Sequence, residues 1–169
     1  YLSDEVKDTK SAIKGAQDII AEKVSDDPKF REKITDSINN YSFIVCKLKK
    51  DAKDEKGVYK KYYDYSEKLK YIEDHRIMAI NRASKEKIIS FSFEYDKEYL
   101  YRYCFRGLSR DRDSIVNDLV YDAVVDGLDR LALPSVENEV WSSLFERASN
   151  KSIEVFANNL EHLLLQAPV

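Results

Sequence analysis

The sequence predicts a mainly α-helical fold: a helical domain with a small β element of two short strands, followed by a long C-terminal helix. Three observations predict this class. Glycine and proline are rare, with only four and three residues in 169, so helix-breaking positions are few. Charged residues make up 35% of the chain and apolar residues 43%, a balance typical of a packed helical domain. Apolar residues also recur three and four positions apart over long stretches.

Two short helices are predicted near the start of the chain. Asp8 and Thr9 can cap a first helix that ends near Ser25. Asp27 followed by Pro28 repeats the start signal, because an acceptor at the N-cap and a proline at the first helical position both favour a helix. We expect these two helices to form a hairpin. The apolar face of the second helix carries Phe30, Ile34 and Ile38.

The two predicted strands lie in the middle of the chain. Residues 41–48 form a short apolar run. Residues 88–95 alternate between apolar and polar side chains, which is the pattern of a half-buried strand. We expect a helix over residues 75–82 between them. A further short helix should follow Asp96 and stop at Gly107, since glycine commonly terminates helices.

The last third of the chain predicts two helices that pack on each other. The first opens at Ser109 or Asp111 and ends at Leu133-Pro134, because proline disfavours continuation of a helix. The second continues toward Pro168, a rod of roughly 50 Å at ~1.5 Å per residue. Its stripe from about residue 152 onward should contact domains outside this chain. The residues we expect to be buried against the first helix are Trp141, Leu144, Phe156 and Leu160.

These elements suggest two parts, a helical subdomain with short strands over residues 1–108 and the helix pair over residues 109–169. The chain begins with Tyr1 and its only methionine is Met78, which indicates a fragment of a larger multidomain protein. No apolar run reaches the length of a membrane span and no signal peptide is recognisable, so we expect a cytoplasmic protein without a membrane partner. Cys46 and Cys104 stand far apart, and we expect two buried thiols.

The formal net charge is −3, which disfavours strong nucleic-acid binding by the chain alone, because such binding depends on neutralising phosphates. Residues 57–112 carry the excess of basic groups. In this region Arg76 and Arg82 are candidate phosphate contacts. The alternative is that they anchor the fold by bonding to acids such as Glu73 and Glu86.

Two aromatic and basic clusters offer further nucleic-acid-binding candidates. Around Arg102 and Arg106, tyrosines alternate with arginines, and both arginines are candidate phosphate contacts. An earlier tyrosine cluster is interleaved with lysines and could stack single-stranded bases, although tyrosines at helical spacing more often pack with the hydroxyl at the rim. Its members are Tyr59, Tyr62, Tyr63, Tyr65 and Tyr71.

Catalytic chemistry finds little support in the sequence. No nucleophile elbow, zinc-protease motif or phosphate-binding glycine loop occurs, so we expect no enzyme activity and no cofactor. One carboxylate stripe, ending beside Arg130, could suggest a metal site. A single stripe opposite an apolar face is better interpreted as the solvated side of a helix. The stripe consists of Asp118, Asp122, Asp126 and Asp129.

Five blocks, in order, carry a family resemblance across nearly the whole chain. They are AIKGAQDIIAEKVSDD at 12–27, YYDYSEKLK at 62–70, HRIMAINRA at 75–83, LDRLALPSVENEV at 128–140 and FANNLEHLLLQAP at 156–168. Together they resemble the bacterial transcription accessory protein family Tex. The resemblance implies the internal helical region that precedes an RNase H-like domain called YqgF, with helix-hairpin-helix and S1 domains further along.

The resemblance implies a non-catalytic scaffold segment of a transcription accessory protein, which binds RNA or DNA through its other domains and modulates transcription. The neighbouring RNase H-like, helix-hairpin-helix and S1 domains of the same chain are then its expected partners. The alternative is a protein-interaction platform that docks the transcription machinery, with RNA polymerase as the candidate partner.

Overall fold

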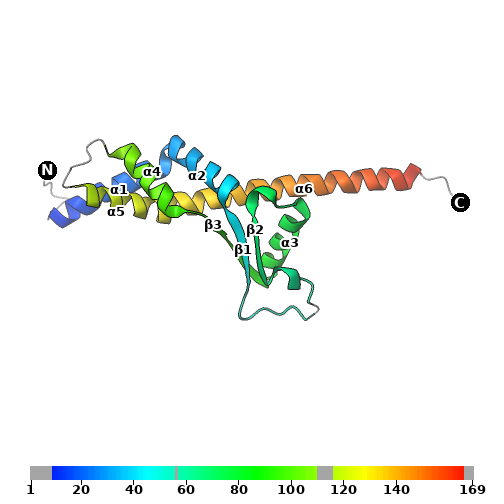
Figure 1. Ribbon diagram of the computed structural model, residues 1–169. Coiled ribbons are helices and arrows are strands. Elements are labelled where there is room, and N and C mark those ends of the chain that lie inside the picture. The colour runs from blue at the N-terminus through cyan, green and yellow to red at the C-terminus, as the bar shows by residue number, and fades with distance from the viewer. Residues whose placement is uncertain (1–8, 56, 110–115, 166–169) are drawn as a thin grey trace. The chain divides into compact units, whose positions relative to one another are not determined.

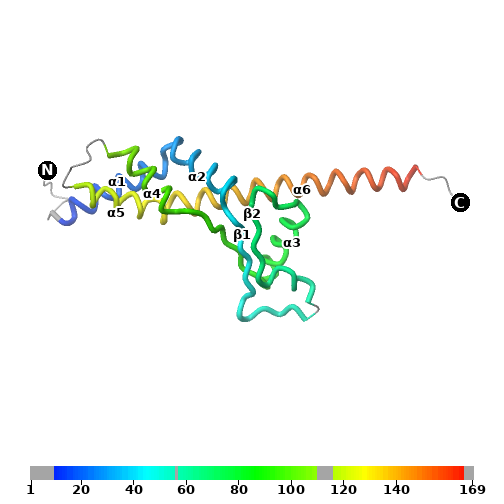
Figure 2. Tube along the Cα trace, in the orientation of Figure 1, coloured from blue at the N-terminus to red at the C-terminus, as the bar shows by residue number. Residues whose placement is uncertain are grey.

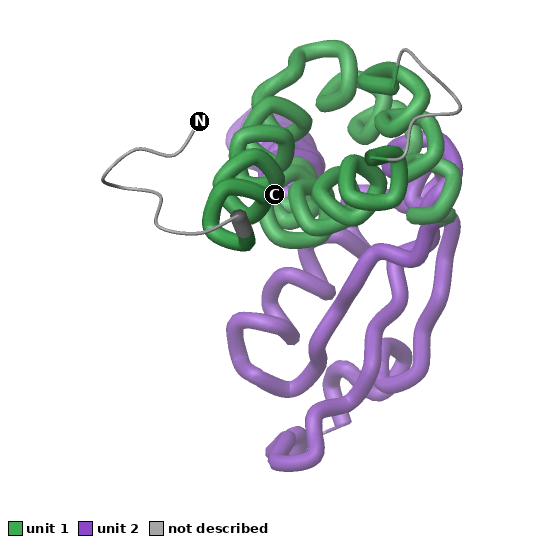
Figure 3. Tube along the Cα trace, turned by 90° about the vertical axis from the view of Figure 1, so that its left-hand side faces the viewer, with its two compact units in different colours: residues 1–37, 96–138 green, residues 38–95, 139–169 purple. Residues whose placement is uncertain are grey.

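The computed structural model describes residues 9–55, 57–109 and 116–165. It confirms the predicted fold class, with helices dominating, one small sheet and a long C-terminal helix (Figure 1). Contacts divide the chain into two compact units, residues 1–37 with 96–138 and residues 38–95 with 139–169 (Figure 3). The predicted division of this chain into residues 1–108 and 109–169 stays a prediction.

The first unit is built on α1 (Thr9–Asp26), α4 (Lys97–Leu108) and α5 (Asn117–Gly127). Helix α1 packs against α5, as Figure 2 shows, and not chiefly against the next helix in a hairpin as the sequence suggested. The start signal at Asp27 is confirmed, because its carboxylate accepts a hydrogen bond of 2.8 Å from the Lys29 backbone N–H. That signal opens α2 (Pro28–Tyr41), whose predicted apolar face of Phe30, Ile34 and Ile38 is buried.

The predicted helix after Asp96 is also confirmed. The Asp96 side chain accepts a hydrogen bond of 2.9 Å from the Tyr99 backbone N–H, which satisfies an otherwise unpaired donor of the first turn of α4. The helix ends at Leu108. Ser109 is therefore the C-cap of α4 and not the start of the next helix. Asp111 lies outside the described residues.

Helices α1 and α5 approach each other closely at one glycine. A Cβ atom placed on Gly127 would lie 2.6 Å from the Ala21 Cα and 2.8 Å from the Ala21 carbonyl oxygen. These are backbone atoms, so they cannot move aside as a flexible side chain would. Glycine at position 127 is therefore a packing requirement of the first unit.

The second unit contains a three-stranded antiparallel sheet of order β2-β1-β3. Strands β1 (Phe43–Leu48) and β3 (Ile89–Glu94) lie where the sequence predicts strands, but β2 (Asp64–Lys68) was not predicted. The register pairs Ile44 with Phe93 and Cys46 with Phe91, and directly opposed residues share a face of a sheet. This apolar face is the core of the unit.

Both cysteines are fully buried free thiols, as predicted. Burial raises the pKa of the Cys46 thiol to about 11 and that of the Cys104 thiol to about 12, because the thiolate would lose its hydration. The thiolate is the reactive form of cysteine. Both groups therefore act as small apolar core residues at neutral pH.

Helix α6 (Leu133–Leu165) contributes to both units and follows α5 without a turn. Between them, η3 (Leu128–Ala132) is a π-helix in which the Leu133 backbone N–H bonds to the Leu128 carbonyl. The predicted end of the helix at Leu133-Pro134 is thus wrong. The wider turn offers a physical reason, since Pro134 has no N–H to donate and its ring would meet the carbonyl four residues earlier in a regular α-helix.

The predicted burial of the α6 stripe against the preceding helix is wrong for the same reason. Trp141 instead contacts the β3 rings, with centroid distances of 4.2 Å to Phe91 and 6.4 Å to Phe93. Phe156 and Leu160 are 68% and 44% exposed. Among residues 9–55, 57–109 and 116–165, no helix combines the length and apolar character needed to cross a membrane.

The Gly127 contact gives a matched pair of substitutions. We expect Gly127→Ala to lower the free energy of unfolding by about 1–3 kcal/mol, because the added methyl group overlaps the α1 backbone. Gly15→Ala meets no atom within 4 Å and should raise stability by up to about 1 kcal/mol through helix propensity. Urea unfolding followed by circular dichroism measures both. Equal effects of the two changes would show that α1 and α5 do not pack closely here.

Candidate functional site

A carboxylate organises the segment that leads into β2. The Asp54 side chain accepts hydrogen bonds from the backbone N–H groups of Tyr59 (2.9 Å) and Val58 (3.0 Å) and from the Tyr63 hydroxyl (2.8 Å). The bond from Tyr59 is the largest of several that hold the pKa of Asp54 below its usual value. These bonds position η1 (Lys60–Tyr62).

A groove of about 470 Å³ lies beside this segment, within the second unit. Helix α3 (Asp74–Lys85) contributes one face to it, namely His75, Met78, Ala79 and Arg82. These positions recur three and four residues apart, so they line one side of the helix, while Ile77, Ile80 and Ala83 are buried on another. The remaining walls come from Val58, Tyr59, Tyr62 and the α6 residue Ser152.

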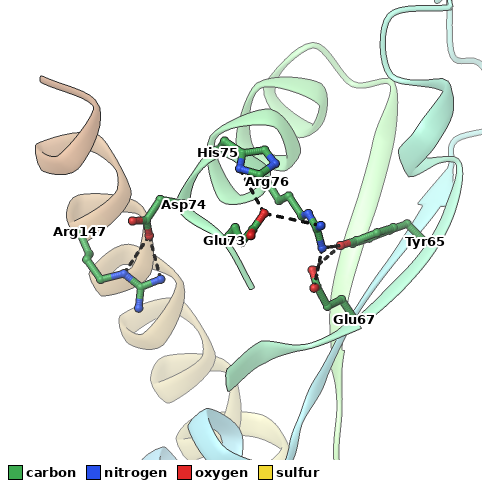
Figure 4. A network of polar contacts seen from close by, with 7 residues as sticks. All are labelled: Tyr65, Glu67, Glu73, Asp74, His75, Arg76 and Arg147. Atoms are coloured by element: carbon green, nitrogen blue, oxygen red, sulfur yellow. Dashed lines mark hydrogen bonds and ion pairs between the residues drawn. The ribbon is translucent and has the colours of Figure 1, made fainter. Parts of the chain in front are cut away.

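The two predicted arginines of α3 have different surroundings. Arg76 donates a hydrogen bond of 2.6 Å to Glu67 on β2 and one of 3.2 Å to the Tyr65 hydroxyl (Figure 4). Its guanidinium also lies 3.6 Å from Glu73. The hydrogen bond to Glu67 is the main reason why the pKa of Arg76 is raised. The structure therefore supports the anchoring interpretation for Arg76, with Glu67 as a partner that the sequence did not predict.

Arg82 lies two turns further along α3 and is exposed. Its side chain makes no hydrogen bond or ion pair with any residue that the structure describes. Burial, with the bond to Glu86, raises the pKa of the nearby Tyr59 hydroxyl, and the Arg82 charge opposes part of this rise. Glu86, which the sequence offered as a partner for Arg82, instead accepts a hydrogen bond of 2.9 Å from Tyr59. Arg82 thus lies exposed at a groove without an ion pair to any described residue.

Several members of the tyrosine cluster are anchored by their hydroxyl groups. Tyr59 bonds to Glu86, Tyr63 to Asp54 and Tyr65 to Glu67. Burial, together with the bond to Glu67, raises the pKa of Tyr65 to about 12. This arrangement supports the packing interpretation. Within the cluster Tyr71 is the most exposed, at 66%.

A second pair of predicted arginines lies on α4 in the first unit. Arg102 and Arg106 line a shallow pocket of about 330 Å³ together with Tyr99 and Tyr103. Arg102 is paired with Glu98 at 2.9 Å, which neutralises its charge locally. Arg106 is exposed. The structure therefore brings Arg102 and Arg106 together but places them in a different unit from Arg76 and Arg82.

Two aspartates of the predicted stripe, Asp126 on α5 and Asp129 in η3, are engaged in surface contacts. Asp126 lies 2.9 Å from Arg130, as the sequence suggested, and Asp129 accepts a hydrogen bond of 2.7 Å from the Tyr101 hydroxyl. Nowhere in the described part of the chain do three His, Cys, Asp or Glu side chains gather as a metal site would need. The stripe thus matches the solvated-face interpretation.

Within the second unit, α6 is attached through side chains that the sequence did not single out. Arg147 binds the Asp74 carboxylate with both contacts at 3.0 Å (Figure 4). The Lys85 ammonium lies 5.5 Å from the centre of the Phe145 ring. With the Trp141 contacts, these interactions join α6 to α3 and β3. Their partners are far apart in sequence, so no local pattern predicts them.

The anchored tyrosines can be tested against an exposed one. We expect Tyr65→Phe to lower the free energy of unfolding by about 1 kcal/mol, because the hydroxyl bonds with both Glu67 and Arg76. The control Tyr71→Phe removes an exposed hydroxyl and should change stability by less than about 0.5 kcal/mol. Urea unfolding of the two variants beside the unchanged chain gives the comparison. A larger loss in Tyr71→Phe would contradict the anchoring of Tyr65.

Comparison with known proteins places the whole chain in one group. The family model described as Tex central region-like matches residues 1–156. The protein YdcI of Bacillus subtilis is 35% identical over 172 residues, which cover 100% of this chain and 24% of that protein. The Transcriptional accessory protein Tex of Neisseria gonorrhoeae is 27% identical, covering 99% of this chain and 23% of that protein.

A more distant similarity extends to a human protein. The human S1 RNA-binding domain-containing protein 1 is 29% identical over 114 residues, which cover 64% of this chain and 12% of that protein. The chain spans about a quarter of the length of the bacterial relatives. On the match of the family model and the identity to YdcI, the chain belongs to the Tex central region-like family.

Proposed function

We propose that this chain is a non-catalytic scaffold segment of a Tex-like transcription accessory protein, which modulates transcription in the cytoplasm and binds nucleic acid through other domains. The observation that carries the proposal is the surface of α6. Every residue from Lys151 to Leu165 is exposed. That segment includes large apolar side chains, among them Phe156, Leu163 and Leu164 at 68%, 65% and 76% exposure.

An apolar stripe of this kind usually marks a contact surface, because soluble proteins rarely leave large apolar patches uncovered. The relatives are about four times as long as this chain, so further domains of the same polypeptide are the natural occupants. The names of the human and bacterial relatives support nucleic-acid binding and transcription as the context. We place RNase H-like, helix-hairpin-helix and S1 domains among those occupants.

The alternative is a protein-interaction platform that docks the transcription machinery, with RNA polymerase as the candidate partner. The groove at Arg82 favours such a contact, because it combines apolar walls with an exposed cation. The two functions depend mainly on different residues, the apolar stripe of α6 and Arg82 with its groove, and can therefore be tested separately.

Hydrogen exchange tests the scaffold role of α6. In the 169-residue chain, we expect amides 153–165 to exchange faster than those of α3, because no described residue covers this part of α6. In a longer chain that includes the following domain of the relatives, the same amides should gain protection of at least about tenfold. The α3 amides serve as the internal control. Unchanged exchange at 153–165 in the longer chain would contradict the scaffold role.

A binding titration tests whether nucleic-acid binding resides in the other domains of the protein and not in this chain. Because the net charge is −3, we expect the chain to bind single-stranded RNA or duplex DNA no more tightly than ~10⁻⁴ M at physiological salt. The longer chain should bind more tightly and with a steeper dependence on salt. Fluorescence anisotropy over a salt series measures both. Sub-micromolar affinity of the 169-residue chain would contradict the proposal that other domains carry the binding.

A further inference from the structure

The groove beside α3 has a distinct charge arrangement. No acidic side chain that the structure describes near it contacts the Arg82 guanidinium. Asp54 and Glu86 accept hydrogen bonds from neutral donors of the Val58–Tyr63 segment and keep their charge, and Glu73 lies 3.4 and 3.6 Å from His75 and Arg76. Arg82 keeps its guanidinium exposed at the groove. The groove therefore presents a cation whose charge no contact with a described residue offsets, which suits an anionic ligand.

Basic side chains next to the groove further favour an anionic ligand. Lys60 and Lys61 belong to η1, whose neighbours Tyr59 and Tyr62 line the groove. Both lysines are exposed, and neither forms an ion pair within the described ranges. A ligand that brought negative charge to Arg82 would meet further positive charge at this end of the groove.

The walls of the groove favour an apolar side chain over a nucleic-acid base. Base stacking needs an open aromatic face. Tyr59 is only 7% exposed, and Tyr62 packs edge-to-face with Tyr65 at a centroid distance of 5.2 Å. Met78 and Val58 provide the non-planar apolar surface, with Val58 66% exposed. Methionine adapts its shape to varied aliphatic and aromatic side chains.

We propose that this groove binds a short acidic segment of a partner protein. A bulky apolar side chain of that segment lies over Met78 and Ala79, and a carboxylate of the same segment pairs with Arg82. An exposed arginine presents a planar fork of donors that suits a carboxylate. The proposal rests on α3 and η1; α6 contributes Ser152 to one wall of the groove, but the apolar stripe beyond that residue takes no part in the contact.

Fluorescence anisotropy with a defined probe tests the proposal. The probe is a short fluorescein-labelled peptide in which Glu alternates with Leu and Phe, titrated with the 169-residue chain. We expect saturable binding that weakens about tenfold in Arg82→Gln, as expected for loss of a charge-assisted contact. Met78→Gln, which keeps the side-chain length but adds a polar amide, should also weaken binding several-fold.

Lys70→Gln is the matched control, because Lys70 is an exposed lysine of the same unit that does not line the groove. It should leave the affinity for the peptide within about twofold, since a remote surface charge contributes only screened attraction. A peptide with Gln in place of Glu should bind at least about tenfold more weakly than the acidic one. Equal losses in Lys70→Gln and Arg82→Gln would reduce the effect to general charge attraction and overturn the proposal.

Two further titrations distinguish the proposed peptide from other ligands that could fill the groove. Oligouridylate is offered in place of the peptide, and Arg82-dependent binding of this RNA without binding of the peptide would assign the groove to nucleic acid and overturn the proposal. The peptide is also titrated into the longer chain. Retained binding there supports a partner in trans. Loss of binding only in the longer chain would mean that the same polypeptide covers the groove, and absence of binding to both chains would also overturn the proposal.

Discussion

The continuity of the helix through Pro134 is the constraint on which the remaining structure depends. A proline inside a regular α-helix removes one hydrogen bond and places its ring against an earlier carbonyl. Here the π-helix η3 widens the turn directly before it, and the helical residues continue from α5 through η3 into α6 without a break. Because the helix continues past Pro134, the apolar side chains of α6 pack on other elements or remain exposed.

The partners that α6 does find explain how its two halves differ. Up to Ala148 the helix carries buried positions such as Val136 and Val140, and Trp141 stacks against the rings of β3. From Lys151 onward every described position is exposed. One helix therefore serves first as a core element and then as a free surface, although its apolar spacing is similar throughout.

Much of the fold is predictable from local signals. The helix starts at Pro28 and Lys97 follow from Asp27 and Asp96, whose side chains bond to backbone N–H groups of the first turn, so the sequence alone contains the cause. Strand β2 has no such local cause. Its sequence, DYSEK, is mostly polar, and it forms a strand because it pairs with β1. Strand formation of this kind depends on tertiary neighbours more than on propensity.

The wrong prediction of a helix end at Leu133-Pro134 also arises because long-range contacts are not visible in the local sequence. Proline is a reliable breaker only when the preceding turn is a regular α-turn. Gly127 directly precedes η3 and allows α5 to lie against the backbone of α1 at Ala21. That contact joins residues more than a hundred positions apart. Sequence periodicity does not reveal such a long-range contact. The sequence therefore predicts a helix end at Leu133-Pro134 from the general rule that proline breaks helices.

The roles of single side chains in the candidate site could likewise not be predicted from the local sequence. Arg76 and Arg82 are on one helix, and in sequence each lies among acids and tyrosines. Their different roles are decided by β2, because Glu67 on that strand binds Arg76. Glu86 lies one turn from Arg82, but its carboxylate accepts a hydrogen bond from the Tyr59 hydroxyl and makes no ion pair with Arg82. Which cation remains available to a ligand is therefore a property of the folded network and not of the local pattern.

The two exposed surfaces of the second unit suit different kinds of contact. The stripe on α6 is long and apolar, and a large apolar contact is typical of permanent association within one protein or assembly. The groove at Arg82 is small and combines a cation with a few apolar side chains. A contact of that size gains specificity from charge but buries too little area for a permanent complex. Scaffold and docking functions are compatible in one chain where the domain that covers the α6 stripe leaves Ser152 and the groove open.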